Sequence, residues 1–270
     1  MLDTVREVIV TTIDHDPNGT HAKHFLNVNE TLDSLYTKKL ISFTDVTNQT
    51  TINAAQDLGW EVAVGKYSTN PARFRAVERA LNQSGQFINL WDADRLIYAA
   101  TVSPTELRDL ITETVKYDFL IVGATPDAIK THQSSMTVWE SIKSWRVGKY
   151  LGIEGDITNR GCFVMSRELA TFVTAYKLED HDETDSLFPM LALAYQKSLR
   201  DSNQFQLSRG IGYKEYEKIV SYEDWLFDGL SPEESARRKN TVEDFERRET
   251  HVKRILDTAQ KISSMYGLTS

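Results

Sequence analysis

Short β-rich runs alternate with helix-like segments along the first half of this chain, and that alternation limits its possible folds more than any other feature. The runs predicted as strands are 7–12, 40–44, 60–64, 87–91 and 119–122. Between them apolar residues recur at helical spacing, which predicts helices at 51–58, 70–82 and 104–116. A strand–helix–strand order implies a mainly parallel, Rossmann-like sheet with helices on both faces, so the predicted fold class is α/β.

The start of the third predicted helix carries its own signal. Ser103 can cap the helix, Pro104 suits the first helical position, and Glu106 completes a capping-box pattern. We therefore expect the helix to begin at Pro104.

The second half of the chain is less regular. The predicted elements are a strand at 162–165 and helices at 167–176 and 186–199. From 232 to 266 the sequence is helical and densely charged, with a break near residue 240. Since the sequence shows no repeats and no low-complexity linker, we expect one main domain, 1–230, with a helical C-terminal extension, 231–270, packed on it.

Composition and charge restrict the kinds of protein that this chain can be. With 270 residues, 40% of them hydrophobic and 10% aromatic, it can bury a full core. A formal net charge of -8 argues against general nucleic-acid binding, because that affinity comes mostly from lysine and arginine side chains that neutralise phosphates. No run of about 18 apolar residues is present, so we expect no transmembrane segment. The polar N-terminus also argues against a cleaved signal peptide.

The single cysteine, Cys162, excludes an intramolecular disulfide and fits a reducing compartment. We therefore expect a cytoplasmic protein. The apolar segment 161–165 is typical of a buried strand, which favours core packing for Cys162 over a role as a nucleophile.

The apolar run at 87–91 ends in two carboxylates, Asp92 and Asp94, with only Ala93 between them. Because the chain turns where a strand ends, both side chains can reach one polar site there. Carboxylate oxygens suit Mg²⁺ or Mn²⁺, which are commonly shared with substrate phosphates at this edge of an α/β sheet. The motif predicts a metal site in a phosphate-handling enzyme. A solvated turn in which an aspartate bonds its own backbone is the alternative.

This Asp-x-Asp motif after a strand resembles that of the nucleotide-diphospho-sugar glycosyltransferases of the GT-A fold. Over residues 5–200 the chain is also similar to a bacterial group of GT-A-type proteins in the order of several short segments. These are 92–96, 104–107, 119–125, 131–132 with Glu140, 161–167, and 184–185 before Pro189. The resemblance implies a metal-dependent glycosyltransferase that moves a sugar from a UDP- or GDP-linked donor to an unknown acceptor, with Mn²⁺ or Mg²⁺ on the diphosphate. Asp94 would be a direct metal ligand, and Asp92 either a second ligand or a contact to the ribose or donor sugar.

Two positions depart from that group. Ala124 stands where an arginine is expected, and Gln133 stands where a proline is expected after His132. Both changes bear on acceptor recognition, and they leave a non-catalytic GT-A-like binding protein as an alternative. The resemblance places His132 and Glu140 in the acceptor or sugar site, whereas taken alone they are typical of surface or packing positions.

Residues near the donor are expected from three other segments. Thr11, Thr12 and Asp14 follow the first predicted strand, where the base and ribose would lie in a GT-A fold. Arg73, on a predicted helix, is a candidate phosphate contact. Arg95, next to the acidic pair, is expected to pair with phosphate or with a carboxylate.

An acidic run, 179–185, precedes the predicted helix at 186–199. Most of it fits a solvated loop whose charges complement the helix dipole. We single out Asp185, or Glu183, as a candidate catalytic residue that would act as general base in an inverting transfer or orient the acceptor hydroxyl in a retaining one. His251, in the charged tail, is expected to be a surface helix residue.

A different phosphate enzyme is the remaining alternative. A nucleotidylyltransferase would show a glycine-rich, basic loop after its first strand, whereas 11–16 is neither glycine-rich nor basic. An Asp-nucleophile phosphatase would carry its Asp-x-Asp after the first strand, and in this chain the motif comes later.

Overall fold

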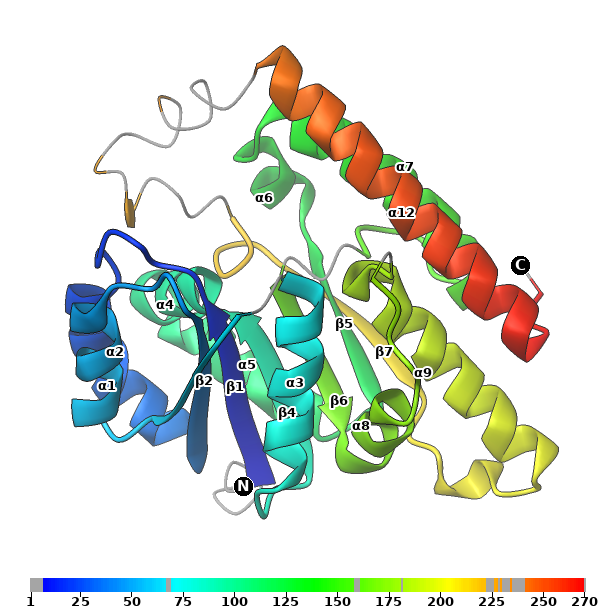
Figure 1. Cartoon of the computed structure of the whole chain (residues 1–270). Coiled ribbons are helices and arrows are strands. Elements are labelled where there is room, and N and C mark those ends of the chain that lie inside the picture. The colour runs from blue at the N-terminus through cyan, green and yellow to red at the C-terminus, as the bar shows by residue number, and fades with distance from the viewer. Residues whose placement is uncertain are drawn as a thin grey trace.

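A seven-stranded sheet forms the centre of the computed structural model (Figure 1). The structure describes residues 7–66, 69–157, 161–180, 182–221, 226–227, 229, 234 and 241–269. Its strands are β1 (Val8–Asp14), β2 (Lys38–Thr44), β3 (Glu61–Gly65), β4 (Phe87–Asp92), β5 (Phe119–Ala124), β6 (Cys162–Ser166) and β7 (Ile211–Tyr216). They lie in the order β3-β2-β1-β4-β6-β5-β7, so β4 is the central strand.

The strands of this sheet run in one direction except for β6. β1 pairs in parallel with β2 and β4, β2 with β3, and β5 with β7. β6 lies antiparallel between β4 and β5, with Cys162 opposite Trp91 and Met165 opposite Phe119. The carboxyl ends of β1, β4, β5 and β7 consequently share one edge of the sheet, and β6 begins at that edge. The predicted mainly parallel α/β class is confirmed.

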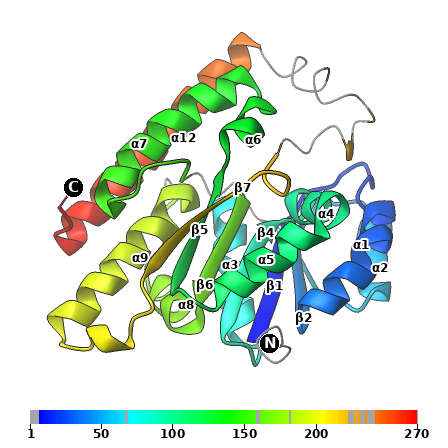
Figure 2. The same ribbon diagram turned by 180° about the vertical axis from the view of Figure 1, so that it is seen from behind.

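Helices cover both faces of the sheet (Figures 1 and 2). One face carries α1 (Ala22–Leu35), α2 (Gln49–Asp57), α4 (Ala93–Val102) and α5 (Pro104–Thr114). The other face carries α3 (Thr69–Leu81), α8 (Arg167–Thr174) and α9 (Thr184–Asp201), with α7 (Ser134–Leu151) and α12 (Val242–Tyr266) packed beside α9. The short pieces are α6 (Pro126–Lys130) and a 3-10 turn at Phe205–Leu207.

Alternating strand residues supply two apolar cores, one on each face. In β4, Phe87 and Trp91 pack on the side of α4 and α5, whereas Ile88 and Leu90 pack on the side of α3 and α9. All four side chains are buried. Successive side chains of a strand point to opposite faces, so a run that is apolar throughout suits a strand covered on both sides. Asp92 ends this run at the edge of the sheet.

Side chains cap the N-termini of α5 and α12. Ser103 Oγ accepts a hydrogen bond from the backbone N–H of Glu106 at 3.4 Å, as the sequence predicts. The reciprocal bond of the capping box is not formed, because the Glu106 carboxylate accepts from the backbone N–H groups of Lys218 and Ile219 and the N–H of Ser103 donates to Ala99. Thr241 Oγ1 accepts a hydrogen bond from the backbone N–H of Asp244 at 3.2 Å. The predicted break near residue 240 thus precedes the start of α12. Of the predicted helical region, residues 232, 233 and 235–240 lie outside the described residues.

Four longer elements, α1, α4, α7 and β7, are missing from the sequence prediction. α1 begins at Ala22, and its N-cap residue His21 makes no side-chain capping bond, whereas α4 follows β4 with no intervening turn. β7 mixes polar and apolar residues because it is an edge strand of the sheet. The division into 1–230 and 231–270 stays a prediction. Within the described ranges, no helix is long and apolar enough to cross a membrane.

Candidate active site

Asp92 and Asp94 lie at the carboxyl edge of the sheet, where β4 passes directly into α4. Asp92 is the last residue of β4 and the N-cap residue of α4, and Asp94 is in the first turn of that helix. Asp94 Oδ1 accepts a hydrogen bond from the backbone N–H of Arg95 at 2.8 Å. The unpaired N–H groups at the start of α4 favour negative charge here. The buried strand thus ends at the acidic pair, as the sequence predicts.

Gly161, immediately before β6, allows the backbone to approach Asp92. Its φ is 69°, in the left-handed region, and a Cβ at this position would lie 2.6 Å from Asp92 Oδ2. Any other residue here would strain the backbone and displace the carboxylate.

Arg73, from α3, holds Asp92 in a two-point ion pair. Arg73 Nε donates to Asp92 Oδ1 at 3.0 Å, and Nη2 donates to Oδ2 at 2.5 Å. Arg73 Nη1 donates to Asp185 Oδ1 at 2.9 Å. Although burial opposes its charge, Asp92 and Asp185 raise the pKa of Arg73 above its usual value. Burial raises the pKa of Asp92, and Arg73 offsets that effect only in part.

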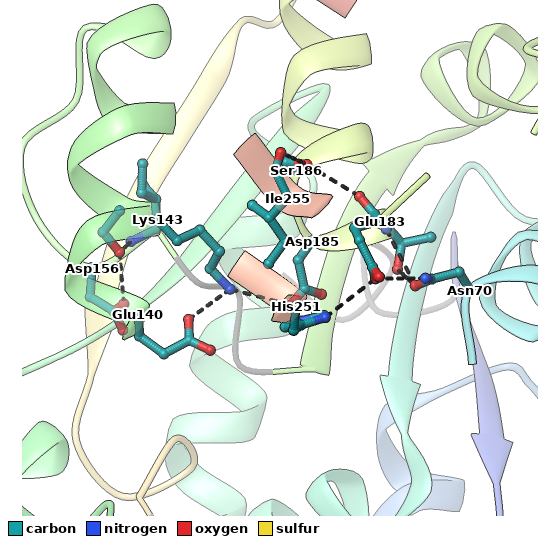
Figure 3. Close-up of polar contacts among 12 residues, drawn as sticks. Asn70, Glu140, Lys143, Asp156, Glu183, Asp185, Ser186, His251 and Ile255 are labelled. Atoms are coloured by element: carbon teal, nitrogen blue, oxygen red, sulfur yellow. Dashed lines mark hydrogen bonds and ion pairs between the residues drawn. The ribbon is translucent and has the colours of Figure 1, made fainter. Parts of the chain in front are cut away.

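Lys143, from α7, is a second buried cation at this edge. Its side chain is 1% exposed, and its Nζ lies 2.7 Å from Glu140 Oε2 and 3.2 Å from Asp185 Oδ2 (Figure 3). Burial opposes the charge of Lys143, but Asp185 and Glu140 raise its pKa above the usual value. Burial would raise the pKa of Asp185, but Lys143, His251 and Arg73 hold it well below its usual range. Asp185 is therefore an ionised carboxylate among three cations.

His251 reaches the same carboxylates from α12. Its Nδ1 lies 3.5 Å from Glu183 Oε2, and its Nε2 lies 3.7 Å from Asp185 Oδ2 (Figure 3). Burial lowers the pKa of His251, but hydrogen bonding and attraction to the two carboxylates outweigh burial and raise the pKa to about 9. Asn70 Nδ2 also donates to Glu183 Oε2, at 2.6 Å. His251 lies on a helix and its side chain is 40% exposed, as expected for a surface helix residue, but α12 packs against α9 and also brings it to the site.

Asp14 ends β1 at the same edge of the sheet and is 5% exposed. Its Oδ1 lies 2.9 Å from His21 Nδ1, whereas its Oδ2 has no hydrogen-bond partner among the described residues. Burial raises the pKa of Asp14 despite the neighbouring His21. A buried acceptor of this kind suits a ligand that brings a hydroxyl or an N–H group.

Thr11 and Thr12 lie inside β1. Their hydroxyls donate to the backbone carbonyls of Ala76, at 3.2 Å, and Leu40, at 3.4 Å. The expectation that they follow the first strand is wrong, because the strand extends to Asp14. Threonine is β-branched and fits a strand, and here its hydroxyl is satisfied by neighbouring backbone.

His132 and Arg95 contact the segment that follows β7. His132 is buried, and its Nε2 lies 2.9 Å from the carbonyl oxygen of Val220. Arg95 is also buried, and its Nη1 donates to the carbonyl oxygen of Ser221 at 3.4 Å. Both side chains therefore hold this segment against the body of the protein. Their predicted roles toward acceptor and phosphate stay predictions.

The acidic pair offers a divalent cation few protein ligands. Both oxygens of Asp92 accept hydrogen bonds from Arg73. Within the part of the chain that the structure describes, no group of three or more His, Cys, Asp or Glu side chains is arranged to hold a metal. A hard cation such as Mg²⁺ on a diphosphate needs only one or two carboxylates, since phosphates and waters supply its other ligands. Asp94 fits that requirement, and Asp92 fits it when Arg73 pairs with another anion.

Comparison with known proteins finds likeness in structure alone. No protein-family profile and no curated protein sequence matches the chain. Glucosyl-3-phosphoglycerate synthase from Mycobacterium tuberculosis, in complex with uridine diphosphate, superposes with a TM-score of 0.56 at 14% identity, over 98% of this chain and 82% of that one. Its complex with Mn²⁺, UDP-glucose and phosphoglyceric acid superposes with a TM-score of 0.53 at 13% identity, over 98% and 81%. These are GT-A-type glycosyltransferases, so the predicted GT-A-like fold is confirmed.

Proposed function

We propose that this GT-A-fold chain is a glycosyltransferase that moves a sugar from a nucleotide-diphosphate donor to a hydroxyl acceptor. The observation that carries the proposal is the acidic pair Asp92 and Asp94 at the end of the central strand, beside the buried ion pairs of Arg73. Ligands of open α/β sheets bind at this edge. Proteins of the same fold hold uridine diphosphate and, in one complex, Mn²⁺ with UDP-glucose, which supports a UDP-linked donor over a GDP-linked one.

Three side chains would recognise the donor. The unpartnered Oδ2 of Asp14 would accept a hydrogen bond from the ribose or the base. Arg73 presents a planar fork of donors that matches phosphate as well as carboxylate, so it would exchange Asp92 for the diphosphate. Arg95 would add a second cation. Asp94, joined by Asp92 after that exchange, would hold Mn²⁺ or Mg²⁺, which supplies positive charge to the leaving diphosphate.

Asp185 would orient the acceptor hydroxyl. Burial alone would raise its pKa, but three neighbouring cations hold that pKa well below the usual range, and a carboxylate of low pKa is a weak general base. Arg73 and Lys143 each hold one of its oxygens, which fixes the direction of the carboxylate. Glu183, held by Asn70 and His251, supports the same arrangement.

A thermal-shift measurement tests the proposal. UDP or GDP, each with Mn²⁺, is added to the wild type and to Asp94→Asn. At about a hundredfold excess over Kd, we expect UDP with Mn²⁺ to raise Tm by about 5 °C or more, and Asp94→Asn to remove the increase. Asp57→Asn, at an exposed position of α2, is the matched control and should keep it. The proposal is wrong if neither nucleotide raises Tm in the presence of metal.

One observation favours a second function, that of a non-catalytic nucleotide-binding protein. Arg73 engages both oxygens of Asp92, and an ion pair that persisted in the complex would keep Asp92 from the metal. Release of UDP from UDP-glucose separates the two functions. A protein that binds the donor with Mn²⁺ and releases no UDP, whatever hydroxyl compound is added, would be a binding protein.

A further inference from the structure

A cavity of about 740 Å³ lies beside the candidate active site, and the roles proposed above for donor and metal binding do not use it. Its walls come from the end of β5, from α6, from one side of α7, from the loop after α7 and from β7. Ala124, the last residue of β5, places the cavity at the same edge of the sheet as Asp92. A volume of this size accommodates a small organic molecule.

The charged groups that line this cavity are mostly negative. The carboxylates are Glu140, Glu154, Asp156 and Glu215. Among the described lining residues, Lys149 is the one lysine or arginine, and its Nζ lies 4.2 Å from the centre of the Trp145 ring. A phosphate or carboxylate placed here would meet like charge in a partly desolvated space, which is unfavourable.

The remaining walls are largely apolar. Pro126, Ile129 and Ile153 are among the lining residues, together with Gly148 and Gly152. Trp145 lines the cavity and is 60% exposed. An exposed tryptophan beside an apolar cavity offers a flat surface to an apolar or aromatic group.

Ion pairs join this cavity to the candidate catalytic carboxylate. Glu140 lines the cavity, and its Oε2 lies 2.7 Å from Lys143 Nζ. The same Nζ lies 3.2 Å from Asp185 Oδ2 (Figure 3). A hydroxyl bound near Glu140 would therefore lie near Lys143, which in turn contacts Asp185, the carboxylate that we assign to orienting the acceptor.

We propose, resting on the proposed glycosyltransferase function, that this cavity binds the acceptor, and that the acceptor is an uncharged hydroxyl compound with an apolar or aromatic part. Its hydroxyl lies toward Glu140 and its apolar part against Trp145. This substrate class differs from the phosphoglyceric acid held by the solved protein of the same fold.

The proposed sugar transfer balances in atoms and electrons. The bond between the anomeric carbon and the diphosphate oxygen breaks, and its electron pair leaves with the nucleoside diphosphate. A bond forms between the anomeric carbon and the acceptor oxygen, and the hydroxyl proton passes to water. Neither oxidant nor reductant takes part.

Calorimetric titration without nucleotide or metal tests the cavity independently of transfer. The probes are octyl β-D-glucoside below its micelle concentration and 3-phosphoglycerate. We expect the glucoside to bind, and 3-phosphoglycerate to bind at least about tenfold more weakly. Ser141→Trp places a large side chain at an exposed lining position of α7 and should weaken glucoside binding by about tenfold or more. Ser198→Trp, at an exposed position of α9 outside the lining, is the matched control and should bind the glucoside as the wild type does.

A charge reversal gives a second measurement. Glu154→Lys, at an exposed position of the cavity wall, should strengthen 3-phosphoglycerate binding, and Glu217→Lys, exposed and outside the lining, should not. Tighter binding of 3-phosphoglycerate than of the glucoside by the wild type would overturn the inference, as would glucoside binding that Ser141→Trp leaves unchanged. If the glucoside binds as expected but UDP-glucose with Mn²⁺ produces no shift in Tm, the cavity assignment stands and the transferase function fails.

Discussion

Arg73 donates to both carboxylate oxygens of Asp92, at 3.0 and 2.5 Å, and to Asp185 through Nη1 at 2.9 Å. A carboxylate held in this way is not free to give both of its oxygens to a metal. Under the proposed function, guanidinium and divalent cation would therefore be alternative partners for Asp92, just as diphosphate and carboxylate would be alternative partners for Arg73. Donor binding at this edge is expected to exchange ion pairs.

Replacing Arg73 tests its structural role. Arg73→Ala should lower the free energy of unfolding by about 3 kcal/mol, because it leaves the partly buried Asp92 without its cation and removes one cation from Asp185. The measurement is urea denaturation. Arg75→Ala, on the exposed side of the same helix, is the control and should cost about 1 kcal/mol or less. Equal losses in the two variants would contradict the buried ion pair.

The pH dependence of stability should report on His251. Its pKa is raised in the folded protein to about 9, from 6.5 for the free side chain. Its contribution is therefore fully present below pH 6.5 and is lost as the pH rises through 9. Since the side chain is 40% exposed and solvent screens its charge, we expect a contribution of about 1 kcal/mol.

Urea denaturation of the wild type and of His251→Gln at pH 6, 8 and 10 measures this contribution as the difference between their free energies of unfolding. Other titrating groups are the same in both proteins, so their effects largely cancel. The difference should be largest at pH 6 and nearly absent at pH 10. A difference that stays constant over this range would show that His251 contributes by packing alone.

Coupling between Lys143 and Asp185 can be measured directly. Lys143→Met and Asp185→Asn, singly and together, should give an interaction free energy of about 1–3 kcal/mol, because the pair is buried. The exposed pair of Lys197 and Asp201 on α9, treated in the same way, should give about 0.5 kcal/mol or less. Comparable values for the two pairs would mean that Lys143 is solvated, against the 1% exposure of its side chain.

Removing divalent metal should leave the nucleotide-free protein unchanged. The described residues contain no cluster of three metal-ligating side chains, and at this edge Arg73 and Lys143 compensate the carboxylates. EDTA should therefore not alter Tm without nucleotide, yet it should abolish the increase in Tm that UDP and Mn²⁺ produce. A lower Tm in EDTA alone would reveal a metal that stabilises the fold itself.

The sequence predicts the elements whose signals are local. The strand β4 ends at Asp92, one residue beyond the predicted end, because the unbroken apolar run is buried on both faces and the first carboxylate after it lies at the edge of the sheet. Ser103 caps α5 as expected, because capping depends on residues three positions apart. The order of these strands and helices indicates a mainly parallel α/β sheet, and the resemblance in the Asp-x-Asp motif and the neighbouring segments implies the GT-A-like fold, which the structural comparison confirms.

What the sequence misses depends on contacts between distant segments. α7 buries Lys143 and exposes Trp145, so its pattern does not read as an amphipathic helix. Lys143 is buried because Asp185 faces it from another helix, and His251 is at the site because α12 packs against α9. Arg73 was expected near phosphate, but its carboxylate partners are visible only in the folded chain.

The placement of His251 on α12 sets an order of assembly during synthesis. Every strand of the described sheet precedes α12 in the chain, so a growing polypeptide can pair its strands before His251 leaves the ribosome. Until then Glu183 and Asp185 lack this histidine, and the docking of α12 completes the charge balance around these two carboxylates after the strands have been made.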